Sequence, residues 1–127
     1  MRHLMITILA VILLTGCSKD TDEGNDLLGN WKWVETSGGM DGTIESPQTT
    51  GDDILLQITE SSIRRYVNGD LESDMTYTLQ TGESIRGGQQ EIITYENEWK
   101  QSVERSGNQL ILYDECFDCY QHEYIKD

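Results

Sequence analysis

Three cysteines carry most of the chemistry that this chain of 127 residues offers. Cys17 directly follows Leu14-Thr15-Gly16, at the end of an apolar run that starts at Leu4. Cys116 and Cys119 form a C-x-x-C pair near the other end of the chain. A cysteine thiol can be oxidised to a disulfide, act as a nucleophile or bind a metal. The residues around each cysteine decide which of these chemistries its position favours.

The segment before Cys17 predicts a secretory signal, because Arg2 and His3 precede the apolar run and small residues end it. The run from Leu4 to Leu14 has 11 residues, whereas a membrane-spanning helix needs about 20. Leu14-Thr15-Gly16-Cys17 resembles the lipobox of bacterial lipoproteins. The resemblance implies that the Cys17 thiol receives a diacylglyceryl group and that cleavage before Cys17 makes it the new N-terminus. A lipidated Cys17 would anchor the protein in a membrane.

These features predict three regions: a signal peptide at 1–16, an acidic flexible tether with lipidated Cys17 at 17–26, and one domain at 27–127. Residues 18–26 contain no large apolar side chain and therefore cannot become ordered by burial. The acidic cluster behind Cys17, with Lys19 and Asp20, resembles the surface-export signal of Bacteroidota lipoproteins. We therefore expect a lipid-anchored protein of the outer membrane, with the domain on either its cell-surface side or its periplasmic side.

The Cys116-Phe117-Asp118-Cys119 motif admits several interpretations. Its acidic surroundings disfavour a thiolate and hence redox catalysis. Zinc binding by Cys116, Cys119 and His122 has a plausible spacing, but no second cluster supplies a fourth ligand. Strands expected at 109–115 and 119–125 place the cysteines at the two ends of a tight turn, within reach of a disulfide. The sequence thus favours a disulfide, while a zinc site and free, partly buried thiols stay as alternatives.

Charge and composition exclude several classes of function. The chain has 9 Lys and Arg against 23 Asp and Glu, a net charge of −14, which repels nucleic acids. After cleavage His122 is the one histidine left, and no serine lies in a Gly-x-Ser-x-Gly motif. The glycine pairs lack the helix and lysine of a phosphate-binding loop. We therefore expect a non-catalytic domain without a metal or cofactor.

From residue 27 onward the apolar residues alternate with period two, which predicts strands. One such face comprises Ile54, Leu56 and Ile58, and another comprises Met75, Tyr77 and Leu79. Pairs such as Asn68-Gly69 and Gly107-Asn108 mark the turns between strands. The pattern predicts an all-β domain of about eight to nine short antiparallel strands. Closure into an up-and-down barrel would hide the edges of such a meander.

Leu28-Gly29-Asn30-Trp31-Lys32-Trp33-Val34, followed by Gly38-Gly39, resembles the opening of the lipocalin-like domains of Bacteroidota outer-membrane lipoproteins. The shared element is Gly-x-Trp, here Gly29 and Trp31. Further segments resemble later parts of that family: 66–69, 76–79, 110–114 and the final Tyr120-x-x-x-Tyr124. The resemblance implies a lipocalin-like barrel in which Trp31 closes the base, and binding of a small apolar ligand. Lipocalins often cover this tryptophan with an arginine, and here Lys126 takes that place.

Seven residues are candidates to contact such a ligand: Trp31, Trp33, Tyr77, Trp99, Tyr120, His122 and Tyr124. The competing interpretation is that these rings simply fill the core. A carrier is expected to surround its cavity with the loops at 38–53 and 81–90. The alternative function is a surface-exposed protein-interaction module whose barrel is packed and free of ligand.

Overall fold

The protein is an all-β barrel, as the alternation of apolar residues predicts. The computed structural model describes residues 26–127. The signal peptide, the lipidation site at Cys17 and the tether up to residue 25 lie outside the described residues, so they stay predictions. Within residues 26–127 no helix has both the length and the apolar character needed to cross a membrane.

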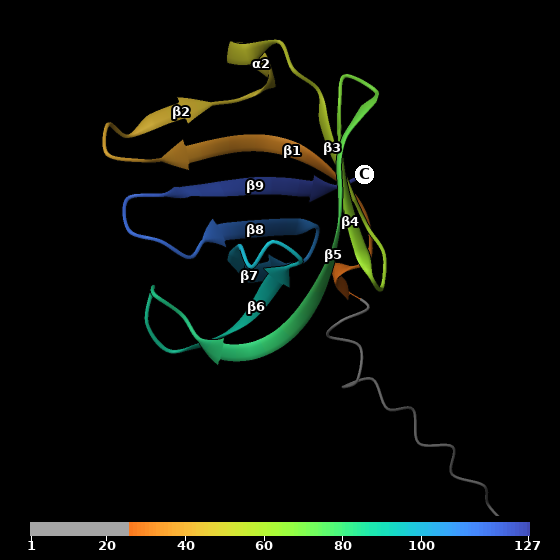
Figure 1. Cartoon of the computed structure of the whole chain (residues 1–127). Helices are drawn as coiled ribbons and strands as arrows, with labels where there is room; N and C mark the ends of the chain where they lie inside the picture. Colours follow the sequence, from red (N-terminus) through yellow and green to blue (C-terminus); the bar gives the residue numbers. More distant parts are fainter. Residues whose placement is uncertain (1–25) are drawn as a thin grey trace, which may run out of the picture.

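Nine strands and one short helix form the domain (Figure 1). Their bounds are β1 Gly29–Gly38, β2 Thr43–Glu45, α2 Pro47–Thr50, β3 Ile54–Ile58, β4 Ser62–Val67, β5 Asp70–Glu83, β6 Gln89–Tyr95, β7 Lys100–Ser106, β8 Gln109–Asp114 and β9 Tyr120–Lys126.

The strands pair in the order β2-β1-β3-β4-β5-β6-β7-β8-β9, and β1 also pairs with β9. Eight antiparallel strands therefore form a closed ring, while β2 is an additional strand on the outer half of β1. The first and last strands of the ring lie side by side in Figure 1, where Trp33 pairs with Tyr124. Closure leaves the ring without an edge strand on which another chain could pair.

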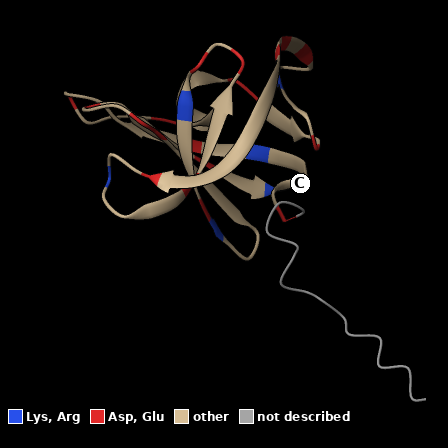
Figure 2. Cartoon of the chain, turned by 60° about the horizontal axis from the view of Figure 1, so that its bottom comes forward, with Lys and Arg blue, Asp and Glu red and all other residues tan. Residues whose placement is uncertain are grey.

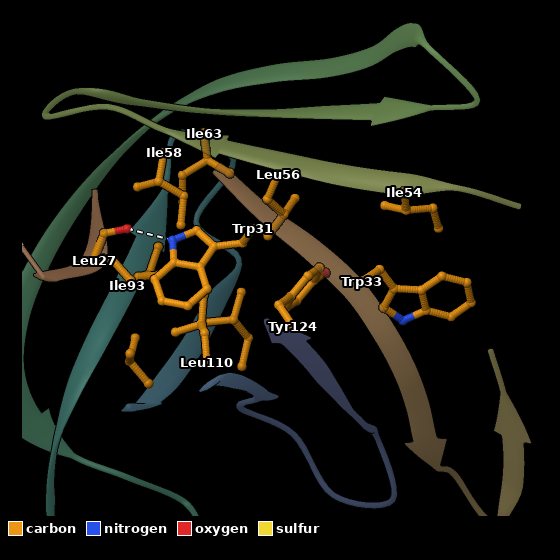
Figure 3. Packing of buried hydrophobic residues seen from close by; sticks show 12 residues of the cluster. Leu27, Trp31, Trp33, Ile54, Leu56, Ile58, Ile63, Ile93, Leu110 and Tyr124 are labelled. Atoms are coloured by element: carbon orange, nitrogen blue, oxygen red, sulfur yellow. Dashed lines mark hydrogen bonds between the residues drawn. The ribbon is translucent and has the colours of Figure 1, made fainter. Parts of the chain in front are cut away.

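One end of the barrel is filled by a hydrophobic core around Trp31. The indole of Trp31 is 2% exposed, and Figure 3 shows it between Ile58 and Ile63 on one side and Ile93 and Leu110 on the other. Its Nε1 donates a hydrogen bond to the Leu27 carbonyl at 2.9 Å, so the polar atom of the ring is satisfied. We call this end the base of the barrel.

Lys126 closes the base from the outside. Its Nζ lies 4.6 Å from the centroid of the Trp31 ring and donates to the Leu28 carbonyl at 2.7 Å. The expected cover of Trp31 by Lys126 is therefore present as a cation–π contact. Gly29 permits this approach, since its φ is +128° and a Cβ there would lie 2.5 Å from Nζ. This geometry explains why Gly-x-Trp suits the start of β1.

A register shift in β1 turns different side chains inward at its two ends. Trp31 and Trp33 alternate into the barrel, but the pairing with β9 shifts between Trp33 and Glu35. Beyond the shift Glu35 pairs with Glu123, and Thr36 pairs with His122. A strict alternation from Trp33 would have pointed Glu35 inward, whereas this irregularity brings Thr36 there. The shift therefore sets the chemistry of the barrel interior next to His122.

The segment between β1 and β3 contains β2 and the single turn of helix α2. Ser46 caps α2, because its side chain accepts from the Thr49 backbone N–H while the Thr49 hydroxyl accepts from the Ser46 backbone N–H. Pro47 occupies the first turn, where its missing N–H costs no hydrogen bond. This part of the expected 38–53 loop is thus locally structured, and β2 pairs with the half of β1 that is away from the base.

Acidic residues are spread over several strands and turns of the barrel (Figure 2). Basic residues often have an acidic partner, as in Arg64–Asp74, Arg65–Glu72 and Arg105–Glu91. The negative charge is thus distributed over the surface rather than gathered on one face.

Candidate functional site

A pocket of about 560 Å³ occupies the end of the barrel opposite the base. Apolar side chains of β1, β3, β4 and β8 line it, namely Trp33, Ile54, Leu56, Ile63 and Leu112. Polar and aromatic side chains complete the lining: Thr36, Glu45, Asp52, Arg65, Ser73, Tyr95, Asn97, Trp99, Gln101, Asp114, Tyr120, His122 and Tyr124, with Met75. The barrel is therefore solid at the base and hollow at the other end. We call this cavity the barrel pocket.

Five of the seven residues expected to contact a ligand line the barrel pocket: Trp33, Trp99, Tyr120, His122 and Tyr124. Trp31 lies in the base core, below the pocket. Tyr77 packs against the core, and its hydroxyl donates to the Thr59 carbonyl at 2.6 Å. The period-two pattern places these two rings on inward faces, but it does not show how far along the barrel each one lies.

A continuous chain of hydrogen bonds runs along one wall of the pocket, from β1 across β9 and β8 to β7 and β6. The His122 Nδ1 is 3.0 Å from Thr36 Oγ1, and its Nε2 is 3.3 Å from both oxygens of Asp114. Gln101 Nε2 donates to Asp114 Oδ1 at 2.9 Å, and the Tyr95 hydroxyl donates to Gln101 Oε1 at 2.6 Å. These bonds fix the orientation of the polar wall.

The carboxyl of Asp114 is held in its ionised form. Burial raises its pKa, but hydrogen bonds from His122 and Gln101 and the charge of His122 outweigh burial and lower the pKa below the ordinary value of 3.8. An ionised Asp114 requires a proton on the facing His122 Nε2. When the imidazole is neutral, His122 Nδ1 accepts a hydrogen bond from the Thr36 hydroxyl, and when it is protonated Nδ1 donates to Thr36 Oγ1.

Thr36, His122 and Asp114 follow the hydroxyl–imidazole–carboxylate order that activates nucleophiles in some hydrolases. However, the indole Nε1 of Trp33 donates to Thr36 Oγ1 at 2.8 Å. Thr36 Oγ1 is thus engaged by both Trp33 and His122, and the arrangement fixes the shape of this wall and the polar atoms that it presents.

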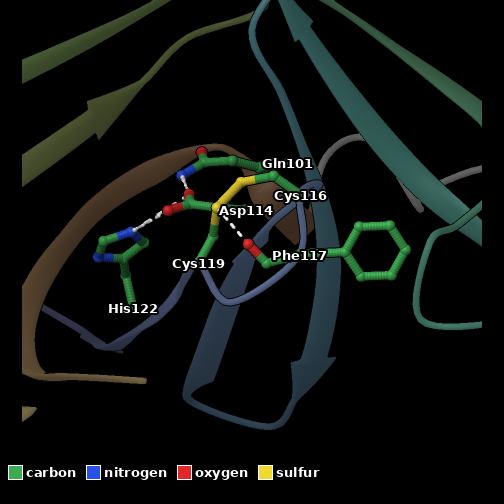
Figure 4. Close-up of a disulfide and its surroundings, with 6 residues drawn as sticks. All are labelled: Gln101, Asp114, Cys116, Phe117, Cys119 and His122. Atoms are coloured by element: carbon green, nitrogen blue, oxygen red, sulfur yellow. Dashed lines mark hydrogen bonds and ion pairs between the residues drawn. A yellow bond between two sulfur atoms is a disulfide. The ribbon is translucent and has the colours of Figure 1, made fainter. Parts of the chain in front are cut away.

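A tight turn carrying a disulfide lies beside this wall. Cys116 and Cys119 are joined, with their Cα atoms 5.6 Å apart. Figure 4 shows the disulfide next to Asp114, while the ring of Phe117 points away from the Asp114–His122 pair. The turn docks on the end of β1, where the Gly39 N–H donates to the Cys119 carbonyl at 3.1 Å. Gly38 is needed there, because its φ is +118° and a Cβ would lie 2.7 Å from that carbonyl oxygen.

We expect the purified protein to contain this disulfide. In protein alkylated without a reductant, mass spectrometry should find the peptide with Cys116 and Cys119 free of alkyl groups and about 2 Da lighter than the mass calculated for two thiols. Because the closed loop is short, replacing both cysteines by serine should lower the free energy of unfolding by only about 2 kcal/mol. Complete alkylation of both thiols without a reductant would contradict the bond, and zinc retained by that protein would favour the metal alternative.

Loop 81–90 was expected to surround the pocket, but it does not lie there. Its residues do not line the barrel pocket, since β5 extends to Glu83 and β6 begins at Gln89. The turn between them is instead tied to the outside of the barrel: Ser84 Oγ and the Ile85 N–H donate to Glu115 at 2.7 and 2.9 Å, respectively. The β6–β7 turn borders the pocket in its place, with Asn97 and Trp99.

Sequence reasoning missed several residues of the pocket, chiefly Thr36, Arg65, Tyr95, Gln101 and Asp114. Arg65 and Gln101 share inward faces with apolar residues, Ile63 and Val103, respectively. A polar residue on the apolar face of a predicted strand was therefore the available signal. Thr36 gave no such signal, because its inward direction depends on the register shift in β1.

The exposed end of the barrel carries large apolar side chains around the pocket. Met40, Ile44, Trp99, Phe117 and Tyr120 are all exposed, and they belong to the turns and strand ends on the pocket side. Phe117 is 83% exposed at the tip of the disulfide turn. We call these five residues the apolar rim. Where such side chains form a continuous patch, the surface is typically one that contacts a ligand or another macromolecule.

Among residues 26–127 no group of three or more histidine, cysteine, aspartate or glutamate side chains is arranged to hold a metal ion. The disulfide also engages both sulfurs that the zinc alternative requires. Comparison with known proteins gives no match to a family model, a curated protein or a solved structure.

Proposed function

We propose that this protein is a lipid-anchored lipoprotein of the outer membrane whose lipocalin-like barrel binds a small, largely apolar ligand without catalysis. The lipobox-like segment at Leu14–Cys17 supports the anchor, and the antiparallel barrel is consistent with a lipocalin-like domain. The barrel pocket carries the proposal of binding. Its volume of about 560 Å³ falls within the range of about 300–1,000 Å³ that is typical of small-molecule sites.

The orientation of the barrel relative to its N-terminus is compatible with a membrane anchor at one end and a ligand pocket at the other. The chain enters at the base, where Leu27 is buried next to Trp31, and the pocket lies at the other end. An anchor at Cys17 would be joined to the base by the nine residues 18–26, which can span at most about 30 Å. The pocket would then be on the side of the domain away from its attachment point, accessible to molecules outside the membrane.

The test is binding of a neutral apolar dye, N-phenyl-1-naphthylamine, to the purified protein. Dye fluorescence should rise with roughly one-to-one stoichiometry, and tryptophan emission should fall because Trp33 and Trp99 line the pocket. Ser73→Trp, which places a large ring into the pocket from β5, should weaken dye binding at least tenfold.

The matched control is Thr78→Trp, which adds the same ring to the exposed face of β5. This variant should bind the dye as the unaltered protein does. Equal binding by both variants would place the dye outside the pocket. Absence of dye binding to the unaltered, folded protein would overturn the proposed binding function.

The apolar rim favours one second candidate, a module that binds another protein at the pocket end. Neither Met40 nor Phe117 belongs to the hydrophobic core or packs against it. They are the two most exposed large apolar side chains of the described residues. If this candidate holds, Phe117→Ser together with Met40→Ser should abolish capture of a cell-surface partner while dye binding in the pocket stays unchanged.

A further inference from the structure

The barrel pocket has unused hydrogen-bond donors deep inside it. The side chain of Tyr124 lines the pocket and is only 5% exposed. Among residues 26–127 its hydroxyl has no hydrogen-bond partner, although every fully buried polar side-chain atom of these residues has one. The hydroxyl therefore borders the open space of the pocket. It is a donor that a ligand in the pocket could use, because buried polar groups are normally hydrogen-bonded.

The Tyr124 hydroxyl stays protonated at physiological pH and can act as a donor. Burial raises its pKa far above the ordinary value of 10.0, and the nearby charge of Asp114 adds to this effect. The charge of Arg65 opposes it, and of the two charges Arg65 has the larger influence. Arg65 and Tyr124 both line the barrel pocket, so the guanidinium acts on this hydroxyl across the pocket.

Arg65 lies on β4, across the eight-stranded ring from Asp114 on β8. Its Nη1 pairs with Glu72, but a guanidinium carries five N–H donors, so several are left for a second acceptor. Ser73, which is opposite Arg65 in the register of β4 and β5, brings a further hydroxyl to the same wall. Arg65, Ser73 and Tyr124 together form what we call the donor cluster.

The acceptors of the polar wall are already engaged. Asp114 receives hydrogen bonds from Gln101 and His122, and Gln101 Oε1 receives one from Tyr95. Asp52, at the mouth, receives one from Asn68. Glu45 also lines the pocket, but it belongs to the exposed strand β2. Deeper in the pocket Asp114 and Gln101 already accept hydrogen bonds, whereas Tyr124 and Arg65 offer donors to an anion.

We propose that the ligand of the barrel pocket is an amphipathic acid, whose carboxylate is bound by Arg65 and Tyr124 and whose apolar body lies against Trp33, Ile54 and Leu56. This inference rests on the proposed binding function and specifies its ligand class. The pocket offers each half of such a molecule a matching surface. Charge-assisted hydrogen bonds from the donor cluster would bind the carboxylate. Burial of the apolar tail against the apolar wall would remove it from water.

The experiment compares three probes with the same ten-carbon chain: decanoate, decanol and decyltrimethylammonium. Each is titrated against the purified full chain loaded with N-phenyl-1-naphthylamine, and displacement of the dye is measured. Decanoate should bind at least tenfold more tightly than either of the others. Tyr124→Phe, which removes only the hydroxyl, should weaken decanoate binding about ten- to a hundredfold and leave decanol unchanged.

Arg65→Gln should likewise remove the preference for decanoate. The matched controls are Arg64→Gln, whose guanidinium pairs with Asp74 on the outer face, and Tyr77→Phe, whose hydroxyl bonds outside the pocket. Both controls should keep the preference. Near-ultraviolet circular dichroism is used to check that Tyr124→Phe is folded. If Arg65→Gln fails to fold, Tyr124→Phe alone still tests the inference.

Two results would overturn the inference while the proposed function survives: equal displacement by decanoate and decanol, or a preference for the ammonium probe. An unchanged decanoate affinity in Tyr124→Phe and Arg65→Gln would overturn it as well. Failure of the dye itself to bind the folded protein would remove the proposed function and this inference together.

Discussion

Trp31→Ala should lower the free energy of unfolding by about 3–5 kcal/mol. Trp31 is the largest of the fully buried side chains, and its removal would leave a cavity at the base. The Leu27 carbonyl would lose the indole donor, and the Lys126 ammonium would lose the ring on which it lies. Because a domain of this size is stabilised by about 5–15 kcal/mol in total, much of the variant should be unfolded under mild denaturation. Urea titration followed by far-ultraviolet circular dichroism measures the change.

Trp99→Ala is the matched control, since it removes the same side chain from the rim, where Trp99 is 45% exposed. Its free energy of unfolding should change by no more than about 0.5 kcal/mol. Similar losses in the two variants would mean that the base is not the main hydrophobic core. Trp99→Ala should also reduce the quenching of tryptophan emission by the dye, because that ring borders the pocket.

Cys17→Ala should abolish lipid attachment completely. If Cys17 is the acylated residue, its thiol is the atom that forms the bond to lipid, and no neighbouring side chain can replace it. Cells grown with an alkyne-tagged palmitate should label the unaltered protein and leave the variant unlabelled and uncleaved. The variant should also leave the membrane fraction, because stable anchoring depends on the acyl chains.

Cys116→Ser is the control for the labelling, since it removes a different cysteine and leaves Leu14–Cys17 intact. It should be labelled as strongly as the unaltered protein. Equal label on Cys17→Ala and on the unaltered protein would refute the anchor at Cys17, while the barrel and its pocket would be unaffected by that result.

The barrel could be predicted from the sequence because each strand carries its own local signal. Leu110 and Leu112 occupy alternate positions of one strand and are both fully buried, and Asn68-Gly69 and Gly107-Asn108 form turns where they were expected. Lys126 over Trp31 could be expected from the Gly-x-Trp resemblance. The strands and turns depend on residues that are close in sequence. The Lys126–Trp31 contact depends only on the pairing of the first strand of the ring with the last.

The pocket could be predicted only in part, because its depth is a property of the whole barrel. Alternation identifies Trp31 and Trp33 as inward residues, but the tilt of the strands decides that one fills the base and the other lines the pocket. The polar wall was hidden for a similar reason. It joins Thr36, Asp114 and Gln101 from three strands, and a register shift in β1 turns the first of these inward.

The pairing of β1 with β9 has a consequence for how the chain reaches its native state. The two strands that close the ring are the first and the last of the domain, so Trp33 meets Tyr124 only when nearly all of the polypeptide is present. A contact so distant in sequence forms late and slowly, because a long loop must be closed before the contact can stabilise it. A nascent chain that has not yet released β9 therefore has no closed barrel. The topology itself delays closure of the barrel until almost the whole domain has been synthesised.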